Sequence, residues 1–512
     1  MTPFTWSMMN AGFSELNVLP GHPSVGNIGG RIYQNSTVMV SVLQAMGKSF
    51  QDIVQEIGGV REEYLEGMDQ YLIPLPEATL LAILPQGLRV RRKERQGLKN
   101  LEAFVAENPA WCWAMRQRIQ AAESRGKLSS LLVDEIWPRA LESFWRNYAT
   151  ALRYGERAGP LRRELVDLVG ADDADTLLSN VSGEGDLLAS LGPVVGLARV
   201  ADGKMSREAY LEQWGHRGAL ETEASVPRPA EDPDWLDGQL AAFAESPVDV
   251  EALLARQRSK FDAAWKRFEE SQPRKAKTVW HRLHQAADAA RSRETARSES
   301  ARVIWVARAW VLRAGDMTGI GDGAFFLLLE ELIDVLAGKE ESAAYIPARR
   351  RTHEQYTALP PFPMLIRGRF DPIQWAADPE RRSDVFDSHG LLSKLKLKAD
   401  RENVILGMPA SAGQVEGLVR CLQRPEDGDQ LQQGEVLVAS QTNIGWTLFF
   451  PRAAAIVTDV GAPLSHAAIV ARELGIPAVV NCADATARMK TGDRVRVDGA
   501  QGIVEILDTS QP

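Results

Sequence analysis

The stretch that decides the fold of this chain reads TDVGAPLSHAAIVARELGIP over residues 458–477. It follows an apolar run at 453–457 that is typical of a buried strand, and residues 461–464 are expected to form a tight loop. Ser465 can cap a helix, which Gly475 would end in the left-handed conformation before a second strand begins. The apolar side of that helix consists of Ala467, Ile469, Val470 and Leu474. The stretch therefore predicts a strand, a loop, a helix and a strand in succession.

His466 lies at the N-terminus of the predicted helix. The helix dipole disfavours an imidazolium there, so more of the ring stays neutral and nucleophilic near pH 7, and free backbone N–H groups can hold an anion on the ring. Gly461 would let a phosphate donor approach the backbone closely. On these residues alone, two interpretations stay open: a phosphate-carrying histidine, or a half-buried histidine beside a helix cap.

The same stretch resembles the phosphohistidine swivelling domain of the phosphoenolpyruvate-utilising enzymes, whose signature runs approximately T-D-x-G-G-x-x-S-H-A-A-I-V-A-R-E-x-G-I-P-A-V-V. In relatives such as phosphoenolpyruvate synthase and rifampin phosphotransferase, this domain moves between an ATP site and an acceptor site. The resemblance implies that His466 is the carrier and that Thr458, Gly461 and Ser465 support its loop. Ala462 departs from the signature, because a second glycine is usual there.

The resemblance covers the whole C-terminal part of the chain. Residues 406–417 read LGMPASAGQVEG and are similar to the entry strand of swivelling domains. A β-rich pattern follows, with a strand at 434–439 and a strand pair formed by 495–497 and 503–506. The expected fold of residues 403–512 is therefore a swivelling β/β/α domain.

Residues from about 35 to 336 have a predominantly helical pattern, with apolar positions recurring at three- and four-residue spacing. Proline-rich residues 227–233 are expected to separate two helices, and residues 315–323 to form a turn-rich connection. The fold class is accordingly a multidomain α plus α/β protein. The expected divisions are a mostly helical acceptor-binding domain at 1–380, a linker at 381–402 and the swivelling domain at 403–512.

Three shorter motifs in the helical part also resemble the acceptor-binding region of rifampin phosphotransferase-like proteins. They are TPFTWS at 2–7, WGHRG at 214–218 and RETAR at 293–297, in which Arg297 replaces the family's lysine. Arg293 and Arg297 are four residues apart, so both could grip one phosphate from a single helix face, although a solvated face would look the same. His216 could serve as an acid/base group and Arg217 as an anion contact, or both could belong to a polar turn between helices.

Two further groups of residues have both a functional and a structural interpretation. An apolar pocket for a bulky organic acceptor could be lined by Trp6, Met8, Met9 and Trp214, although residues of these types are more often core. Arg349, Arg350 and Arg351 form a basic run that is expected to be either a domain-docking surface or a solvated face.

Composition narrows the classes of function. The formal net charge of -9 argues against nucleic-acid binding, which needs a basic surface. Cys112, Cys421 and Cys482 are too few and too scattered for a disulfide framework or a zinc site, so a reducing cytoplasm is expected. No signal peptide or membrane span is expected, and neither is a dedicated metal site.

The sequence also leaves no room for the ATP-grasp domain or the phosphoenolpyruvate-handling barrel that the resemblance would imply. We therefore expect the acceptor-plus-carrier component of a split ATP-dependent phosphotransferase, with Mg-ATP held by a separate ATP-grasp protein and no cofactor bound tightly here. Phospho-His466 would deliver phosphate to a hydroxyl or carboxylate of a small organic acceptor, with ligation as a possible net reaction, in specialised metabolism. The alternative is a noncatalytic phosphohistidine carrier or regulatory protein, and direct use of phosphoenolpyruvate is disfavoured.

Overall fold

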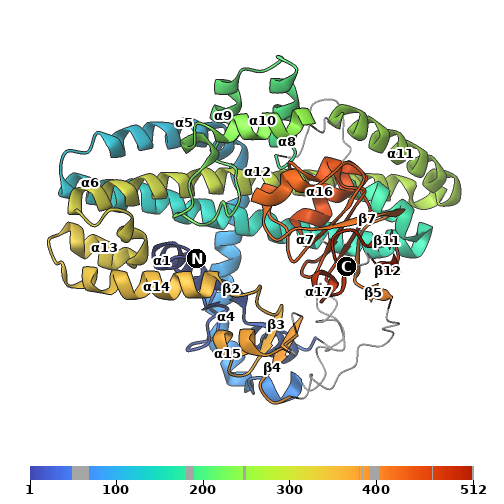
Figure 1. Cartoon of the computed structure of the whole chain (residues 1–512). Helices are drawn as coiled ribbons and strands as arrows, with labels where there is room; N and C mark the ends of the chain where they lie inside the picture. Colours follow the sequence, from blue (N-terminus) through green and yellow to red (C-terminus); the bar gives the residue numbers. More distant parts are fainter. Residues whose placement is uncertain are drawn as a thin grey trace.

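The structure is a computed structural model that describes residues 1–48, 53, 68–179, 189–245, 249–379, 381–382, 384–390, 403–463 and 465–509. Its large helical domain is followed by a C-terminal α/β domain, as predicted (Figure 1). The C-terminal domain lies against one side of the long helices, so the two domains share an extensive boundary (Figure 1).

Two long helices form the axis of the helical domain: α7 (Trp137–Leu178) and α12 (Pro273–Thr318), which pack against each other. α4 (Glu77–Leu98) and α11 (Val250–Ser271) pack on α7, and α5 (Leu101–Gln120) packs on α12. Apolar side chains fill the space between α5 and α12 and between α7, α11 and α12, because each of these helices buries one face.

Shorter helices surround this axis. They are α1 (Pro3–Ser14), α2 (Ser36–Ala45), α6 (Arg125–Leu131), α8 (Gly192–Ala201), α9 (Arg207–Trp214), α10 (Trp235–Glu245), α13 (Leu329–Leu336), α14 (Ile346–Thr357) and α15 (Pro372–Ala377).

Two small sheets lie beside the helices, at the bottom of the view in Figure 1. β1 (Val25–Ile28) and β2 (Arg31–Gln34) form an antiparallel hairpin. β3 (Leu365–Arg367) pairs in parallel with β4 (Val385–Asp387). β4 lies inside residues 381–402, the range expected to be a linker, so this part of the range pairs with a strand of the preceding domain. Residues 391–402 lie outside the described residues.

The C-terminal domain is built on an eight-stranded sheet in the order β5-β12-β11-β7-β8-β9-β10-β6. Strands β7 to β10 run parallel to one another, and the flanking pairs are antiparallel. The strands span β5 (Val404–Leu406), β6 (Met408–Ser411), β7 (Gln414–Cys421), β8 (Val436–Ala439), β9 (Ala455–Thr458), β10 (Ala478–Val480), β11 (Arg494–Asp498) and β12 (Ile503–Asp508). α16 (His466–Leu474) crosses from β9 to β10, and α17 (Ala485–Arg488) covers the other face.

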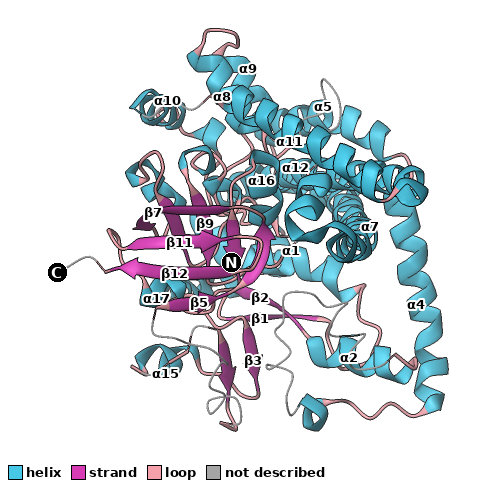
Figure 2. Cartoon of the chain, turned by 90° about the vertical axis from the view of Figure 1, so that its right-hand side faces the viewer, coloured by secondary structure: helices cyan, strands magenta, loops and turns pink. Residues whose placement is uncertain are grey.

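α16 is packed between its own sheet and the helical domain, near α11 and α12 (Figure 2). The same hydrophobic cluster holds Ile469 and Leu474 of the C-terminal domain and Tyr154, Val250 and Ala290 of the helical domain. Burial on both sides explains why every residue of α16 is buried, including its polar ones. The C-terminal domain is thus docked with its histidine-bearing helix inward.

The predicted local features agree with the structure except at some boundaries. The strand expected at 453–457 is Ala455–Thr458, and the one expected at 434–439 is Val436–Ala439. Residues 227–233 form a break, as predicted, that contains a single short turn of helix. The turn expected to begin at Gly315 is wrong, because α12 continues to Thr318 and ends at Gly319 in the left-handed conformation.

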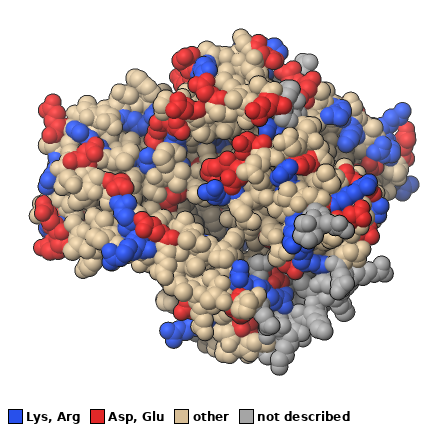
Figure 3. All heavy atoms as spheres, viewed as in Figure 1, with Lys and Arg blue, Asp and Glu red and all other residues tan. Residues whose placement is uncertain are grey.

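Acidic and basic side chains are interspersed on the face shown in Figure 3, and that face is hollowed near its centre. Among the described residues, no helix is both long and apolar enough to cross a membrane.

Candidate active site

His466 is the first residue of α16, at the place predicted from the sequence. The Ser465 side chain accepts a hydrogen bond from the Ala468 N–H at 3.4 Å, and Gly475 ends the helix with φ of 66°. Although it stands at the end of a helix, His466 is only 6% exposed, because the helical domain covers it. Leu464 lies outside the described residues.

Each nitrogen of the His466 ring faces a different partner. Nε2 lies 3.0 Å from the Thr447 hydroxyl oxygen, within the C-terminal domain. Nδ1 lies 3.6 Å from Oε2 of Glu294, a fully buried carboxylate on α12. The ring is therefore held between a hydroxyl of its own domain and a carboxylate of the other.

A group of buried and partly buried charges lies beside this ring, and we call it the charge cluster: Arg217, Glu221, Arg293, Glu294 and Arg297. Arg297 donates from Nε to Glu221 at 2.8 Å, and Arg293 donates from Nη1 to Glu294 at 2.9 Å. Arg217 Nε lies 2.9 Å from Glu221 as an ion pair, but its angle does not make a hydrogen bond. Among the described residues, none of the three guanidinium nitrogens of Arg217 has a hydrogen-bond acceptor.

The charge cluster sets the protonation of its members. Burial lowers the pKa of His466, the Glu294 carboxylate opposes that shift, and the charges of Arg297 and Arg217 add to it. Burial would raise the pKa of Glu294, yet its contact with His466 and the charge of Arg293 outweigh burial and hold that pKa far below its usual range. The cluster thus places an ionised carboxylate against a largely neutral imidazole.

The arginines are arranged differently from the sequence-based prediction. Arg293 and Arg297 do lie on one helix, but each pairs with a different carboxylate. The two arginines whose charges act on the His466 ring are Arg297 and Arg217. Arg217, expected as an anion contact, is therefore one of the two cations that act on the ring.

His216 is fully buried beneath this group, and its Nε2 lies 2.9 Å from the Ser298 hydroxyl. Burial and the charges of Arg302 and Arg217 place its pKa well below the usual value. This environment fits a structural role for His216 better than the acid–base role expected from the sequence.

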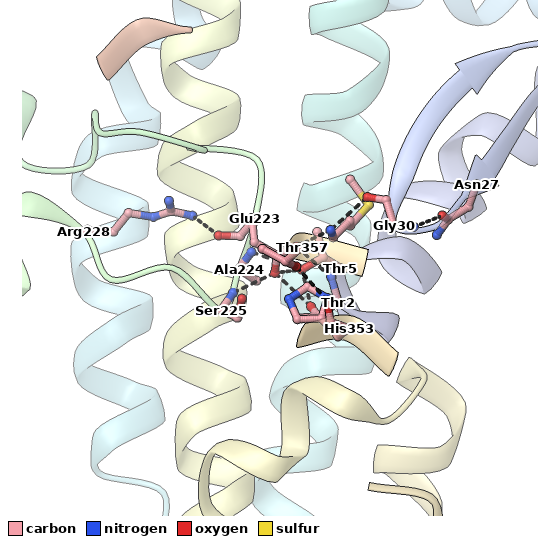
Figure 4. Close-up of polar contacts among 11 residues, drawn as sticks. Thr2, Thr5, Asn27, Gly30, Glu223, Ala224, Ser225, Arg228, His353 and Thr357 are labelled. Carbon is pink, nitrogen blue, oxygen red and sulfur yellow. Dashed lines mark hydrogen bonds and ion pairs between the residues drawn. The ribbon is translucent and has the colours of Figure 1, made fainter. Parts of the chain in front are cut away.

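Glu223 anchors the loop that carries Arg217 and Glu221 of the charge cluster. Its carboxylate accepts hydrogen bonds from the Thr2 N–H at 2.8 Å and from the Thr5 hydroxyl at 2.7 Å (Figure 4). Its carbonyl oxygen accepts from Arg228 at 3.1 Å. These bonds join the motif at residues 2–7 to the loop after the motif at 214–218, so two motifs far apart in the chain form one scaffold.

A cavity of about 920 Å³ borders the loop before His466. Its wall includes Gly461 and Ala462 of that loop, Arg31 and Tyr33 of β2, and Arg367 of β3. Gly461 was expected to let a phosphate donor approach the backbone, but the structure gives another reason for a glycine at this position. A Cβ atom there would lie 2.9 Å from the Val480 Cβ. Close packing against β10 therefore requires the glycine.

Thr458, also expected to support the phosphate, ends β9 just before this loop. Its hydroxyl oxygen is buried and has no hydrogen-bond partner among the described residues.

A separate apolar pocket of about 220 Å³ lies between α1, α7 and α12. Met8 and Met9 line it, together with Phe144 and Ile304. Trp6 is not among its lining residues, and Trp214 packs instead on the glycines of α8. Two of the four residues expected to line an acceptor pocket therefore line this apolar pocket.

The basic run on α14 is largely paired within the helical domain. Arg349 pairs with Glu331 at 2.5 Å, and Arg350 pairs with Asp322 at 2.8 Å. These ion pairs hold α14 against its neighbours, so Arg349 and Arg350 stabilise the helical domain.

Sequence reasoning missed Thr447 and gave Glu294 no functional role. Glu294 stands next to Arg293 in the RETAR motif, so that resemblance could have singled it out. Thr447 follows a short turn of helix that spans Ile444–Trp446, and no local signal identifies it.

Comparison with known proteins agrees with this geometry. Residues 431–502 match the family model described as PEP-utilising enzyme, mobile domain. The match covers β8 to β11 and includes His466.

Among curated proteins, a rifampicin phosphotransferase of Streptomyces sviceus is 29% identical over 342 residues, which cover 61% of this chain and 36% of that protein. The prodigiosin synthesizing transferase PigC of Serratia marcescens is 31% identical over 318 residues, 58% of this chain and 33% of that protein. The uncharacterized phosphotransferase YvkC of Bacillus subtilis is 44% identical over 161 residues, 27% of this chain and 19% of that protein. The chain thus spans about a third or less of the length of these relatives.

Proposed function

Because this chain belongs to the superfamily of PEP-utilising enzymes through its mobile domain, we propose that it is a phosphotransferase component in which His466 carries the phosphoryl group. One observation supports this most strongly. The His466 ring belongs to the C-terminal domain, yet it lies in the charge cluster that the helical domain provides. A carrier domain that delivers its group to the helical domain would dock in this way.

The charge cluster suits phosphoryl transfer, which depends mainly on positioning and on stabilising the charge of the moving group. Arg297 and Arg217 act electrostatically on the His466 ring. The guanidinium nitrogens of Arg217 are buried donors with no acceptor among the described residues, and phosphoryl oxygens would satisfy them. A phosphoryl group on His466 would therefore meet cations already in place.

The acceptor that we propose is a small organic molecule with a hydroxyl or a carboxylate. The cavity beside Gly461 gives it a route to the histidine loop, and the apolar pocket lies farther along α12, at Ser300, Val303 and Ile304. On a helix these residues lie roughly 5–10 Å beyond Arg297. An acceptor with an apolar body could thus place its reactive oxygen near His466, and the rifampicin phosphotransferase relative supports an organic acceptor of this kind.

The phosphoryl source that we propose is Mg-ATP bound to a separate ATP-grasp protein, within specialised metabolism. If the acceptor is a carboxylate, the acyl phosphate would be an activated intermediate and the net reaction a ligation. The name of the Serratia relative, a prodigiosin synthesizing transferase, supports that variant.

The test is to incubate the chain with Mg-ATP and a candidate ATP-grasp protein, then to locate acid-labile phosphate by mass spectrometry. We expect phosphate on His466, none in His466→Ala, and wild-type labelling in the control His284→Ala, because His284 is an exposed histidine of α12. Addition of the true acceptor should remove the label. Labelling of His466→Ala at the wild-type level would refute the carrier role, and stable label with every acceptor tried would favour a noncatalytic carrier.

A further inference from the structure

The two partners of the His466 ring differ in which domain they belong to. Thr447 is part of the C-terminal domain and moves with His466. Glu294 is part of α12 and stays behind whenever the C-terminal domain leaves the helical domain. Docking therefore brings one ring nitrogen to a buried carboxylate, and undocking removes it.

The two contacts define the tautomer of the docked ring. Nδ1 lies 3.6 Å from Glu294 Oε2, just beyond hydrogen-bond distance, and an ionised carboxylate only accepts hydrogen bonds, so Glu294 favours the proton on Nδ1. The other nitrogen, Nε2, then keeps its lone pair and accepts from the Thr447 hydroxyl. Since the lone pair is the nucleophile, Nε2 is the atom of the docked ring that is free to bond to phosphorus, and Nδ1 is left for the proton.

We propose that Glu294 is a positioning residue that activates phospho-His466 for transfer only when the C-terminal domain is docked on the helical domain. The inference rests on the proposed function and specifies where the carrier becomes reactive. In transit, without Glu294 at Nδ1, the P–N bond is less activated. Premature loss of phosphate to water is thereby limited.

The chemistry of the step explains the need for a carboxylate at Nδ1. The bond from phosphorus to Nε2 breaks, and its electron pair returns to the ring. With a proton on Nδ1, the ring leaves as neutral imidazole, whereas without that proton it would have to leave as an imidazolate. The acceptor oxygen forms the new bond to phosphorus, and the proton of an acceptor hydroxyl passes to a phosphoryl oxygen. Glu294 favours the Nδ1-protonated form throughout.

The surroundings of Glu294 suit this role. Its side chain is fully buried, and Arg293 donates to its other oxygen, Oε1, at 2.9 Å. Its Oε2, which faces the histidine, has no hydrogen-bond partner among the described residues. Arg293 and Arg297 keep the carboxylate ionised, so its charge is available to the ring.

The experiment uses the full chain, phosphorylated with phosphoramidate so that no partner protein is needed, and water as the acceptor. The variants are Glu294→Gln and the matched control Glu299→Gln, a buried glutamate of the same helix that accepts from Asn108 and lies near Arg302. We expect Glu294→Gln to lose phosphate from His466 at least about tenfold more slowly than wild type, because the Nδ1 proton is no longer stabilised. Glu299→Gln should behave as wild type.

A second readout separates this role from a merely structural one. In protein labelled with ¹⁵N-histidine, the wild-type His466 ring should show the Nδ1–H tautomer, and Glu294→Gln should shift it, because the amide can donate to Nδ1. Unchanged phosphate loss or an unchanged tautomer in Glu294→Gln would overturn the inference, as would an Nε2–H tautomer in the wild type, which needs no variant to fold. If His466 takes up no phosphate at all, the proposed function itself fails, which is a different outcome.

Discussion

At the scale of single residues, Asp459 is a buried carboxyl placed just before the histidine loop. Burial raises its pKa from the ordinary 3.8 to about 6, although hydrogen bonds from Thr486 oppose the shift. The Thr486 N–H donates to one carboxyl oxygen at 2.9 Å. The folded state therefore binds the proton of the Asp459 carboxyl more tightly than the unfolded chain does. The stability that this protonation gives is fully present below pH 3.8 and is lost as the pH rises through about 6.

Asp459→Asn should therefore stabilise the protein at pH 8 and have little effect at pH 4, because the stability given by the proton is lost between pH 3.8 and about 6. Ionised Asp459 costs roughly 3 kcal/mol above its folded pKa, since the pKa rises from 3.8 to about 6 and one pKa unit corresponds to about 1.4 kcal/mol, and the amide avoids that cost. Thermal melts of wild type and variant at both values of pH would measure the difference. Asp508→Asn, at an exposed aspartate of the same domain, should show no such pH dependence.

The same scale shows which site residues the sequence could predict. Ser465 and Gly475 were predictable because a helix cap and a left-handed helix end depend on neighbouring residues alone. Glu294 meets His466 across a domain boundary, and no local pattern encodes that contact. The burial of His216 likewise arises only when the loop after α9 packs on α12.

At the scale of elements, two glycines of α8 let the indole ring of Trp214 pack directly on the helix backbone. Gly192 and Gly196 are one turn apart, and a Cβ on Gly196 would lie 2.2 Å from a ring carbon of Trp214. Trp214 itself packs with Tyr210, and their ring centroids are 5.3 Å apart. The tryptophan that could have lined an acceptor pocket is instead the contact that fixes α9, and hence the start of the loop bearing Arg217.

Gly196→Ala should destabilise the protein by about 2 kcal/mol, because the added methyl group overpacks a rigid ring. The control is Gly238→Ala in α10, where nothing lies within 4 Å of the new Cβ and alanine should stabilise the helix by roughly 0.5–1 kcal/mol. Urea unfolding measures both. If the double variant Gly196→Ala/Trp214→Leu is no more stable than additivity predicts, overpacking against Trp214 is the wrong explanation.

Element boundaries show why the prediction of a turn at Gly315 failed. Glycine there suggested a loop, but a Cβ at Gly315 would lie only 2.0 Å from the Gly321 carbonyl oxygen. The glycine allows the chain after α12 to fold back against the helix, and the helix itself continues. A pattern in the sequence cannot distinguish a glycine needed for close packing from one needed for a turn.

At the scale of the whole molecule, a buried ionic contact between Asp175 and Arg472 joins the two domains in addition to apolar packing. Asp175 of α7 is 2% exposed and accepts from Arg162 Nε at 2.7 Å. It also faces Arg472 Nε of α16 at 3.7 Å. Arg472 is held in its own domain by the Ala410 carbonyl oxygen at 2.6 Å. Asp175 therefore joins the helical domain to the helix that begins with His466.

Asp175→Asn should weaken docking, because it leaves the guanidinium of Arg472 buried without an opposing charge. Removing one partner of a buried ion pair costs roughly 3 kcal/mol, which would shift the balance between docked and undocked domains by about a hundredfold. The control is Asp173→Asn on the same helix, since Asp173 pairs with the exposed Arg267 and not with the C-terminal domain. Small-angle X-ray scattering should show a larger radius of gyration for Asp175→Asn alone, and hydrogen exchange should rise in α16. If both variants scatter and exchange like wild type, apolar packing by itself holds the domains together, and delivery of His466 to Glu294 does not depend on Asp175.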